Sequence, residues 1–350
     1  MAASSLVPLV VRFGRLGDMV LQTPLFHVLH RRFGHPCRVL TSGPWSSPLF
    51  AGSPDVELVW ELRARHAPFL LSPERWSLLQ RLRKHVGPIY VSEDSRRQLP
   101  KIRRLFAMSG VREERCVFLD RLPALVNEHW VDHLLRLGQA TPADFPCGPA
   151  APGDLWEAPR LFLRPADRDD RMAWLQRRGL AGVPLIVLQP GNKRAIKWGR
   201  ARHEDPKAWP VRHWAALVRA MRQHMPAAHV LLCGSPAEHS YLEDIRRLVG
   251  LDRVSLGTRD LPLRRLLAVL ETAHSMVSVD TGPAHMAAAV GCPLVVLYGS
   301  ESPARWSRRS PSHSRVIELG GPPVSQAASD IPLERVVDAW LDLCAHAAVP

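Results

Sequence analysis

In the N-terminal third of the chain, short apolar runs alternate with longer amphipathic segments. This pattern is typical of strand and helix units repeated around a parallel sheet. The predicted strands are Val7–Phe13, Arg38–Thr41, Val56–Trp60, Pro88–Val91 and Cys116–Leu119. The predicted helices are Pro24–Phe33, Pro73–His85, Arg96–Met108 and Glu128–Leu137.

The second half repeats this pattern more regularly. Its predicted strands are Leu185–Gln189, His229–Gly234, Val254–Leu256, Met276–Asp280 and Leu294–Tyr298. Its predicted helices are Val211–His224, Glu238–Val249, Pro262–Ala273 and Pro283–Val290. Five strands separated by helices favour a second doubly wound sheet.

A change of composition separates the two halves. Residues 139–160 carry five prolines among Ala, Gly and Asp, which favours an interdomain linker. We therefore predict an α/β protein with Rossmann-like domains at 1–160 and 161–330. A helix at Pro332–Leu343, within the stretch 331–350, could pack back on the N-terminal domain. Two such domains facing each other would bind ligands between the carboxyl ends of their strands.

Composition and charge limit the class of protein. Of the 350 residues, 46% are hydrophobic and 23% charged, as in folded domains. The six cysteines form no CxxC pair, which argues against structural zinc and for a reducing compartment. No apolar run is long enough to span a bilayer, and Leu6–Val11 is too short for a signal-peptide core. We expect a cytoplasmic protein that is soluble or peripheral.

The formal net charge of +13 fits a phosphorylated substrate, an anionic membrane surface, or a basic surface without a specific partner. The charge is dispersed and carries no RNA-binding aromatic signature, so we expect no nucleic acid partner. A basic surface without a hydrophobic anchor suggests transient contact with an anionic membrane.

The segment GRLGDMVLQTP follows the first predicted strand. Gly14 and Gly17 allow a tight turn that delivers Asp18 to the carboxyl end of the strand. A carboxylate there can accept a proton from an attacking hydroxyl, although Asp18 could instead cap the following helix. The G-x-x-G spacing is not the dinucleotide fingerprint, which argues against an NAD site.

The segment SVDTGPAH follows a strand and opens a helix of small residues. Thr281 and Gly282 would expose backbone amides at a helix N-terminus, which attracts phosphate, and His285 lies one turn further on. The alternative is a plain N-cap by Asp280 or Thr281.

Two further strand ends carry charged residues. The basic loop Asn192–Lys207 could neutralise a diphosphate leaving group, with Lys207 nearest the next helix, or it could simply be solvated. Glu238 in GSPAE could accept hydrogen bonds from ribose hydroxyls. Alternatively, it could lie in the first turn of a helix, where the helix dipole stabilises a carboxylate.

Taken together, GRLGDMVLQTP, KAWP at 207–210, GSPAE at 234–238 and DTGPAHMAAAVGCPLVVLYGSESPARW at 280–306 resemble glycosyltransferase family 9, the ADP-heptose:lipopolysaccharide heptosyltransferases. The similarity in order and spacing runs from about Pro8 to Trp306. It implies a GT-B fold and an inverting, metal-independent glycosyltransferase without a cofactor. The donor would be a nucleotide sugar, most simply an ADP-linked heptose. The acceptor would be a lipid-linked or phosphorylated glycan of the lipopolysaccharide core, presented at the inner face of the bacterial inner membrane.

The resemblance also implies roles for individual residues. Asp18 falls on the position of the general base. The donor-binding positions fall on Gly17, Lys207, Glu238 at the ribose, Leu261 at the adenine, Asp280, Thr281, Gly282 and His285. The candidates for the acceptor, in the N-terminal domain, are Arg63, Arg65, Lys101, Arg103 and Arg104. The chain departs from the family in its long basic loop before Lys207 and in Gln189, where many members have His.

Two other functions stay open at this point. A sugar-nucleotide epimerase on the same two-domain plan would convert the donor with no acceptor present. A non-catalytic protein would use the same cleft to bind a nucleotide or an anionic glycan.

Overall fold

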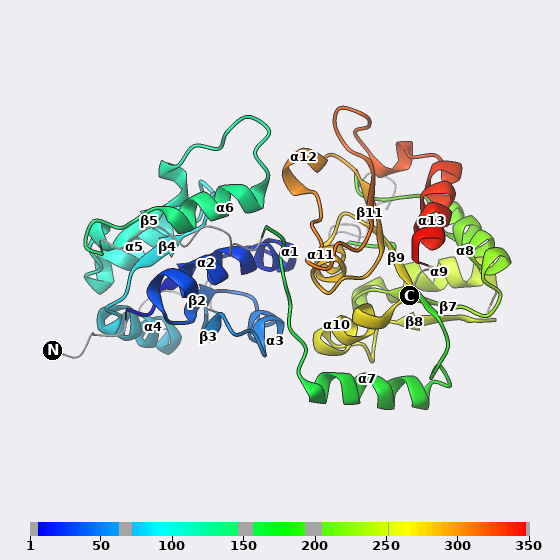
Figure 1. Cartoon of the computed structure of the whole chain (residues 1–350), viewed down its shortest axis with the longest axis horizontal. Coiled ribbons are helices and arrows are strands. Elements are labelled where there is room, and N and C mark those ends of the chain that lie inside the picture. Colours follow the sequence, from blue (N-terminus) through cyan, green and yellow to red (C-terminus); the bar gives the residue numbers. More distant parts are fainter. Residues whose placement is uncertain (1–5, 63–71, 146–156, 193–204, 251, 348–350) are drawn as a thin grey trace. The chain divides into compact units, whose positions relative to one another are not determined.

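A computed structural model describes residues 6–62, 72–145, 157–192, 205–250 and 252–347. The chain divides into two compact units, Met1–Phe162 and Leu163–Pro350, here called the N-unit and the C-unit. Each unit is a parallel sheet with helices on both faces (Figure 1).

The N-unit sheet has the strand order β3-β2-β1-β4-β5, and every pair is parallel. The strands are β1 (Leu9–Val11), β2 (Cys37–Thr41), β3 (Val56–Glu61), β4 (Ile89–Val91) and β5 (Cys116–Phe118). The helices are α1 (Leu16–Val20), α2 (Thr23–Phe33), α3 (Ser46–Phe50), α4 (Pro73–Lys84), α5 (Leu99–Ser109) and α6 (Trp130–Gln139), with short 3-10 turns at Glu113–Arg115 and Leu119–Arg121.

The C-unit sheet has the strand order β11-β10-β9-β6-β7-β8, again all parallel. The strands are β6 (Leu185–Gln189), β7 (His229–Cys233), β8 (Val254–Gly257), β9 (Ser275–Val279), β10 (Leu294–Tyr298) and β11 (Val316–Gly320). The helices are α7 (Pro165–Arg177), α8 (Val211–His224), α9 (His239–Val249), α10 (Leu263–Thr272), α11 (Gly282–Ala289), α12 (Pro303–Trp306) and α13 (Leu333–Ala347), with 3-10 turns at Pro236–Glu238 and Ala328–Asp330.

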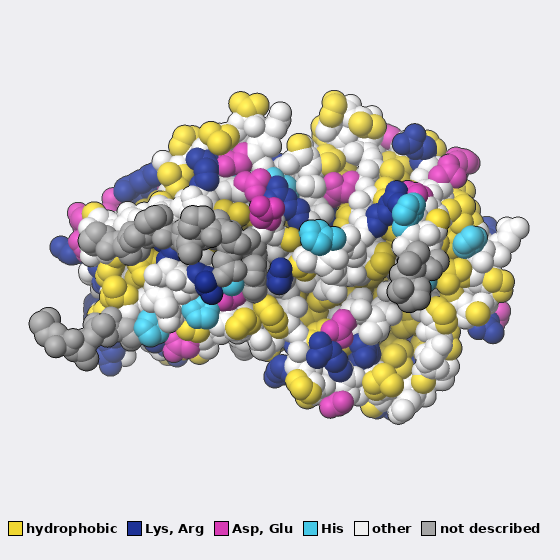
Figure 2. Space-filling model, in the orientation of Figure 1, with side chains coloured by type: hydrophobic (Ala, Val, Ile, Leu, Met, Phe, Trp, Pro, Cys, Tyr) yellow, Lys and Arg dark blue, Asp and Glu magenta, His cyan; other side chains and the backbone are white. Residues whose placement is uncertain are grey.

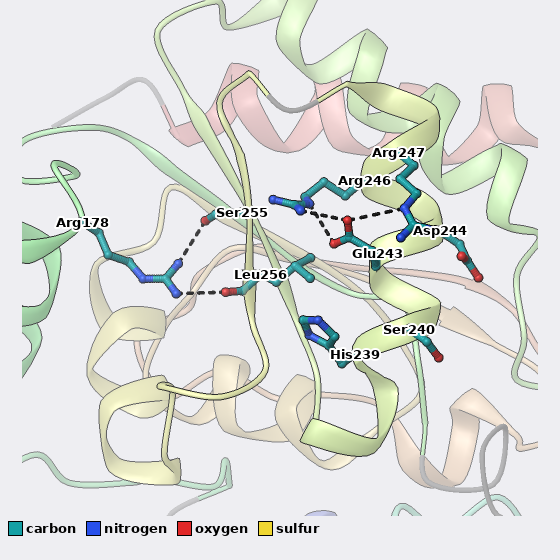
Figure 3. A pocket seen from close by; sticks show the side chains of 9 residues that line it. All are labelled: Arg178, His239, Ser240, Glu243, Asp244, Arg246, Arg247, Ser255 and Leu256. Atoms are coloured by element: carbon teal, nitrogen blue, oxygen red, sulfur yellow. Dashed lines mark hydrogen bonds and ion pairs between the residues drawn. The ribbon is translucent and has the colours of Figure 1, made fainter.

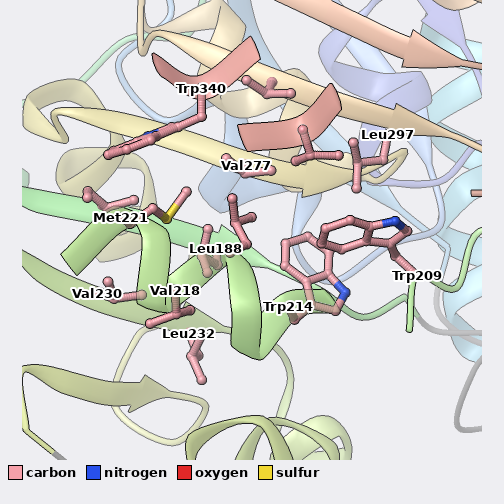
Figure 4. Packing of buried hydrophobic residues seen from close by; sticks show 14 of the residues in the cluster. Leu188, Trp209, Trp214, Val218, Met221, Val230, Leu232, Val277, Leu297 and Trp340 are labelled. Atoms are coloured by element: carbon pink, nitrogen blue, oxygen red, sulfur yellow. The ribbon is translucent and has the colours of Figure 1, made fainter. Parts of the chain in front are cut away.

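Buried apolar side chains hold each sheet to its helices. In the N-unit, one face of β1 and β4 packs on α4 and α5. In the C-unit, Leu188, Val277 and Leu297 of the sheet pack against Trp214 of α8 and Trp340 of α13 (Figure 4). Each unit therefore has an apolar core of its own. Burial of each such side chain contributes roughly 1.5–3 kcal/mol to the free energy of folding.

The final helix packs within the C-unit. Val336, Trp340 and Leu343 of α13 lie in the same buried cluster as β9 and β10, and the Trp340 indole N–H donates to Ser275 Oγ at 3.0 Å. The apolar face that could have packed on the N-terminal domain is therefore buried on the C-unit sheet. The division between the units, after Phe162, lies close to the end of the linker predicted at 139–160.

Charged side chains are spread over the face of the molecule drawn in Figure 2. On the face drawn in Figure 2, Lys and Arg lie scattered among Asp and Glu and do not gather in one patch. Among the described residues, no helix has both the length and the apolar character needed to cross a membrane.

Candidate functional site

In open parallel sheets, ligands bind beyond the carboxyl ends of the strands, at the point where the strand order reverses. In the N-unit this point lies between β1 and β4, and in the C-unit between β6 and β9. Asp18 follows β1, and Asp280 with Thr281 follows β9. Sheet topology therefore places the two main predicted motifs at the two positions where a ligand is expected.

Asp18 lies on α1, in the short turn after β1. Its Oδ2 accepts the Arg15 backbone N–H at 2.6 Å, so the capping role weighed from the sequence is present. A Cβ at Gly14 would lie 2.6 Å from the Asp18 Cβ, which explains the glycine at this turn. A quarter of the Asp18 side chain remains exposed, so the carboxylate can also meet a substrate.

Arg12, a buried arginine that the sequence motifs did not indicate, lies next to Asp18. The Arg12 guanidinium donates to the Ser92 carbonyl at 2.7 Å and to Asp94 Oδ1 at 2.8 Å, both beyond the end of β4. It also lies 3.8 Å from Asp18 Oδ1 and 3.6 Å from Glu93 Oε1. Arg12 thus connects the ends of β1 and β4 and sets the charge around Asp18.

In the C-unit, Asp280 holds two cations. Lys207 Nζ bonds to Asp280 Oδ2, and an Arg308 terminal nitrogen bonds to Asp280 Oδ1. Burial would raise the pKa of Asp280, but Arg308 and Lys207 outweigh it and hold that pKa well below the usual range. Asp280 is therefore ionised, and it joins the predicted Lys207 to Arg308, which the sequence did not single out.

The amino end of α11 carries the predicted phosphate site. Thr281 is its N-cap residue in extended conformation, and its side chain makes no capping bond. Its hydroxyl lies 3.1 Å from Ser278 Oγ, while the Asp280 carboxylate bonds to Lys207 and Arg308. Neither residue caps the helix with its side chain, so the capping alternative is not realised. His285, one turn on, is buried.

Glu238 ends the 3-10 turn after β7 and is only 5% exposed. Its Oε2 accepts the Ser235 N–H and the Ser235 hydroxyl, both at 2.7 Å. Its Oε1 is buried and has no hydrogen-bond partner among the described residues. A Cβ on Gly191 would collide with this oxygen, so Oε1 faces the backbone beyond the end of β6.

The other predicted positions are placed as follows. Leu261 lies beyond β8, where its Cδ2 would be 2.8 Å from a Cβ on Gly257. Lys101 is exposed on α5, whereas Arg103 bonds to Asp120 at 3.0 Å and stacks over Phe118. Arg104 on α5 is exposed and Gly17 lies within α1. Arg63, Arg65 and the basic residues 193–204 lie outside the described residues.

A cavity of about 590 Å³ opens elsewhere, between α9 and the edge strand β8. Figure 3 shows Arg178 reaching from α7's end toward Ser255 and the Leu256 carbonyl, while Glu243 binds Arg246 and Arg247. None of the predicted site residues lines this cavity. Arg178 also pairs with Asp260, which lies outside the lining. The cavity is therefore separate from the candidate site.

The described ranges contain no cluster of three or more His, Cys, Asp or Glu side chains arranged to hold a metal ion. The cysteines that the structure describes are all buried as free thiols. Burial raises the pKa of Cys233 to about 12, so this thiol stays protonated and packs as an apolar group.

The fold is similar to that of the E. coli ADP-heptose LPS heptosyltransferase II, with a TM-score of 0.72 and 21% identity over 98% of this chain and 100% of the other. It is also similar to a family 9 glycosyl transferase of Veillonella parvula, with a TM-score of 0.74 and 15% identity over 99% of each chain. The two Rossmann-like units are therefore those of a GT-B glycosyltransferase fold, as predicted.

Comparison of the sequence with known proteins indicates the family more specifically than the fold does. The chain is 26% identical to the lipooligosaccharide heptosyltransferase 2 of Haemophilus influenzae over 298 residues, which is 82% of both proteins. Residues 174–327 match the sequence model of glycosyltransferase family 9 (heptosyltransferase). The chain is a glycosyltransferase, and the family 9 model matched in its C-unit and the heptosyltransferase relatives support the family predicted from its motifs.

Proposed function

We propose that this glycosyltransferase moves a heptose from ADP-heptose onto the core of lipopolysaccharide, with inversion and with no metal ion or cofactor. The named activity of the Haemophilus influenzae relative and of the E. coli structural relative supports this substrate class. The observation that carries the donor site is the buried Glu238 Oε1 at the carboxyl edge of the C-unit sheet, which has no hydrogen-bond partner among the described residues.

A buried carboxylate oxygen without a partner costs free energy, unless a ligand supplies the missing hydrogen bond. A ribose hydroxyl is a suitable donor, because it is neutral and small enough to meet an oxygen beside Gly191. The ADP diphosphate would lie at the amino end of α11, where side chains leave the first amides uncapped. Lys207 would add a positive charge there.

The chemistry proposed is a single displacement. Asp18 accepts the proton of an acceptor hydroxyl while that oxygen attacks the anomeric carbon of the donor. The bond between this carbon and the diphosphate oxygen breaks, and ADP leaves with the bonding electrons. Attack from the opposite side inverts the anomeric configuration. Lys207 and the α11 amides stabilise the leaving diphosphate, a task that a metal ion performs in other enzymes.

Calorimetric titration with ADP tests the donor site. Losing a hydrogen bond to a charged group costs about 1.5–3 kcal/mol, so Glu238→Gln and Lys207→Ala should each weaken ADP binding by about 10- to 100-fold. The exposed Glu114→Gln and Lys84→Ala variants serve as controls and should bind ADP like the original protein. Unchanged ADP affinity in both site variants would remove the proposed donor site.

Transient contact with an anionic membrane surface is part of the proposal, since a lipid-linked acceptor is presented there. The net charge of +13 supports it, as does an exposed apolar turn that sequence reasoning missed. Val126 is 93% and Leu125 61% exposed, and Glu128 Oε2 accepts the Leu125 N–H at 2.9 Å and so holds the turn.

Co-sedimentation with phosphatidylcholine vesicles, with and without phosphatidylglycerol, tests this contact. We expect binding that increases with phosphatidylglycerol and is reduced several-fold by Val126→Asp. Val324→Asp, at a valine that is 81% exposed, is the matched control. If vesicle binding changes neither with phosphatidylglycerol content nor in Val126→Asp, the proposed membrane contact is excluded.

A further inference from the structure

Arg308 is a fully buried cation in the C-unit, with no exposed side-chain surface. It lies beyond the motif that ends at Trp306, in the segment between α12 and β11. Burying a guanidinium costs several kcal/mol, and a buried ion pair returns little net stability. The cost of this burial therefore calls for a reason other than stability.

On one side, Arg308 is held by β10 and β11. One terminal nitrogen bonds to the Tyr298 hydroxyl, and the guanidinium lies over the Tyr298 ring, 4.9 Å from its centroid. The backbone N–H of Arg308 donates to Glu318 Oε1 at 2.8 Å, and the same oxygen lies 2.9 Å from the Tyr298 hydroxyl. These contacts fix the guanidinium in one position.

On the other side, Arg308 meets the predicted diphosphate site. Its second terminal nitrogen bonds to Asp280 Oδ1, while Lys207 Nζ bonds to Oδ2 of the same carboxylate. Each of the two cations therefore bonds to a different oxygen of the Asp280 carboxylate. The three groups carry one negative and two positive charges, and the only other carboxylate paired with Lys207 among the described residues is Glu301 at 4.0 Å, which is 42% exposed.

This division of charge has an electrostatic consequence. With Lys207 as its sole partner, Asp280 would neutralise the ammonium and leave little charge for a ligand. With Arg308 on Oδ1, Asp280, Lys207 and Arg308 together carry a net charge of +1, and Lys207 is one-seventh exposed. Glu318, the other carboxylate beside Arg308, bonds to the Arg308 backbone N–H and the Tyr298 hydroxyl. A low local dielectric strengthens the attraction of that charge for an anion.

We propose that Arg308 is a positioning residue for the donor site: it holds Asp280 from behind and leaves the Lys207 ammonium with net positive charge for the diphosphate. The inference rests on the proposed function, because it requires that Lys207 meets the phosphates. It adds a residue outside the recognised motifs, which acts through Asp280 and touches no substrate.

The test compares ADP with adenosine, which lacks the diphosphate, as ligands of the full-length protein. Arg308→Met should weaken ADP binding by about 10-fold, as expected for coupled residues, and leave adenosine binding unchanged. Arg308→Lys, which keeps the charge, should restore part of the loss. In a Lys207→Ala background, Arg308→Met should produce no further loss of ADP affinity, because its effect passes through the lysine.

Other outcomes would overturn the inference. Equal losses of ADP and adenosine would indicate a purely structural role, as would an undiminished effect of Arg308→Met without Lys207. If Arg308→Met fails to fold, Tyr298→Phe removes the hydroxyl that holds the guanidinium, and an unchanged ratio of ADP to adenosine affinity in that variant contradicts the inference. If the original protein binds no ADP, the proposed function itself fails.

Discussion

Two buried arginines organise the carboxylates at the ends of the strands. Arg12 joins Asp18 to the end of β4 in the N-unit, and Arg308 joins Asp280 to β10 and β11 in the C-unit. A guanidinium keeps its charge at any pH that the protein meets, and Arg308, together with Lys207, lowers the pKa of Asp280 and holds it in the ionised form. Each carboxylate lies beside a buried arginine, but Asp280 is buried and Asp18 is partly exposed, which fits the different roles proposed for them.

A residue outside the site gives the protein a pH dependence. His85 is 1% exposed and packs edge-on against Trp60. Burial, together with Arg115 and Arg38, lowers the pKa of His85 from 6.5 to about 4. The unfolded chain therefore binds the proton more readily, so stability falls as pH drops below 6.5 and continues to fall until about pH 4.

Urea unfolding at pH 7.5 and pH 5 measures this effect. His85 should lower the free energy of unfolding by about 2 kcal/mol between these two values, as an order of magnitude. His85→Leu should abolish that part of the change, whereas the variant of the exposed His346, His346→Leu, should keep it. An identical pH response in His85→Leu would show that this imidazole is not responsible.

At the scale of elements, a glycine after β10 lets the segment before α8 approach the sheet. A Cβ on Gly299 would collide with the Pro206 carbonyl oxygen and lie 3.1 Å from the Lys207 backbone nitrogen. The Ala328 N–H donates to the same carbonyl at 2.7 Å. Gly299 thus allows Lys207 to reach Asp280.

Gly299→Ala should push this segment outward and weaken ADP binding by roughly 10-fold or more, with a loss of about 1–3 kcal/mol in stability from overpacking. Ser300→Ala, one residue further and exposed, is the control. Calorimetry and urea unfolding measure the two effects. Full ADP affinity in Gly299→Ala would show that the close approach does not position Lys207.

Most elements could be predicted, because their apolar periods are strong. β6, β10 and α8 have the predicted bounds, and the other predicted strands and helices differ by a few residues at their ends. The sequence missed β11 because all five of its residues are only partly buried, so it presents no apolar run. It missed α1, α3 and α12 because five or fewer residues carry no helical period. It also missed the longer α7, where two of the four buried residues, Asp167 and Arg171, are charged and the apolar period is weak.

At the scale of the whole molecule, the site could be predicted only as far as local motifs reach. Asp18, Glu238 and Thr281 stand in short segments at strand ends, where sequence and position agree. The contacts of Arg12 and Arg308 depend on which strands are neighbours in the sheets. Arg12, for example, bonds to residues 80 or more positions away in the sequence. No local pattern contains that information.

The two units divide the proposed work, since the donor residues lie in the C-unit and Asp18 in the N-unit. In the proposed reaction, Asp18 removes a proton from the acceptor. Asp18→Asn tests it best, because the amide oxygen can still accept the Arg15 N–H and keep the turn. The measurement is ADP release from ADP-heptose with and without a heptose-deficient lipopolysaccharide core.

We expect the original protein to release ADP only when the acceptor is present. Asp18→Asn should lower kcat by about 100- to 10,000-fold while its ADP affinity stays within a few-fold of the original. Turnover by Asp18→Asn at the original rate would show that Asp18 is not the general base, and conversion of the donor without any acceptor would contradict glycosyl transfer.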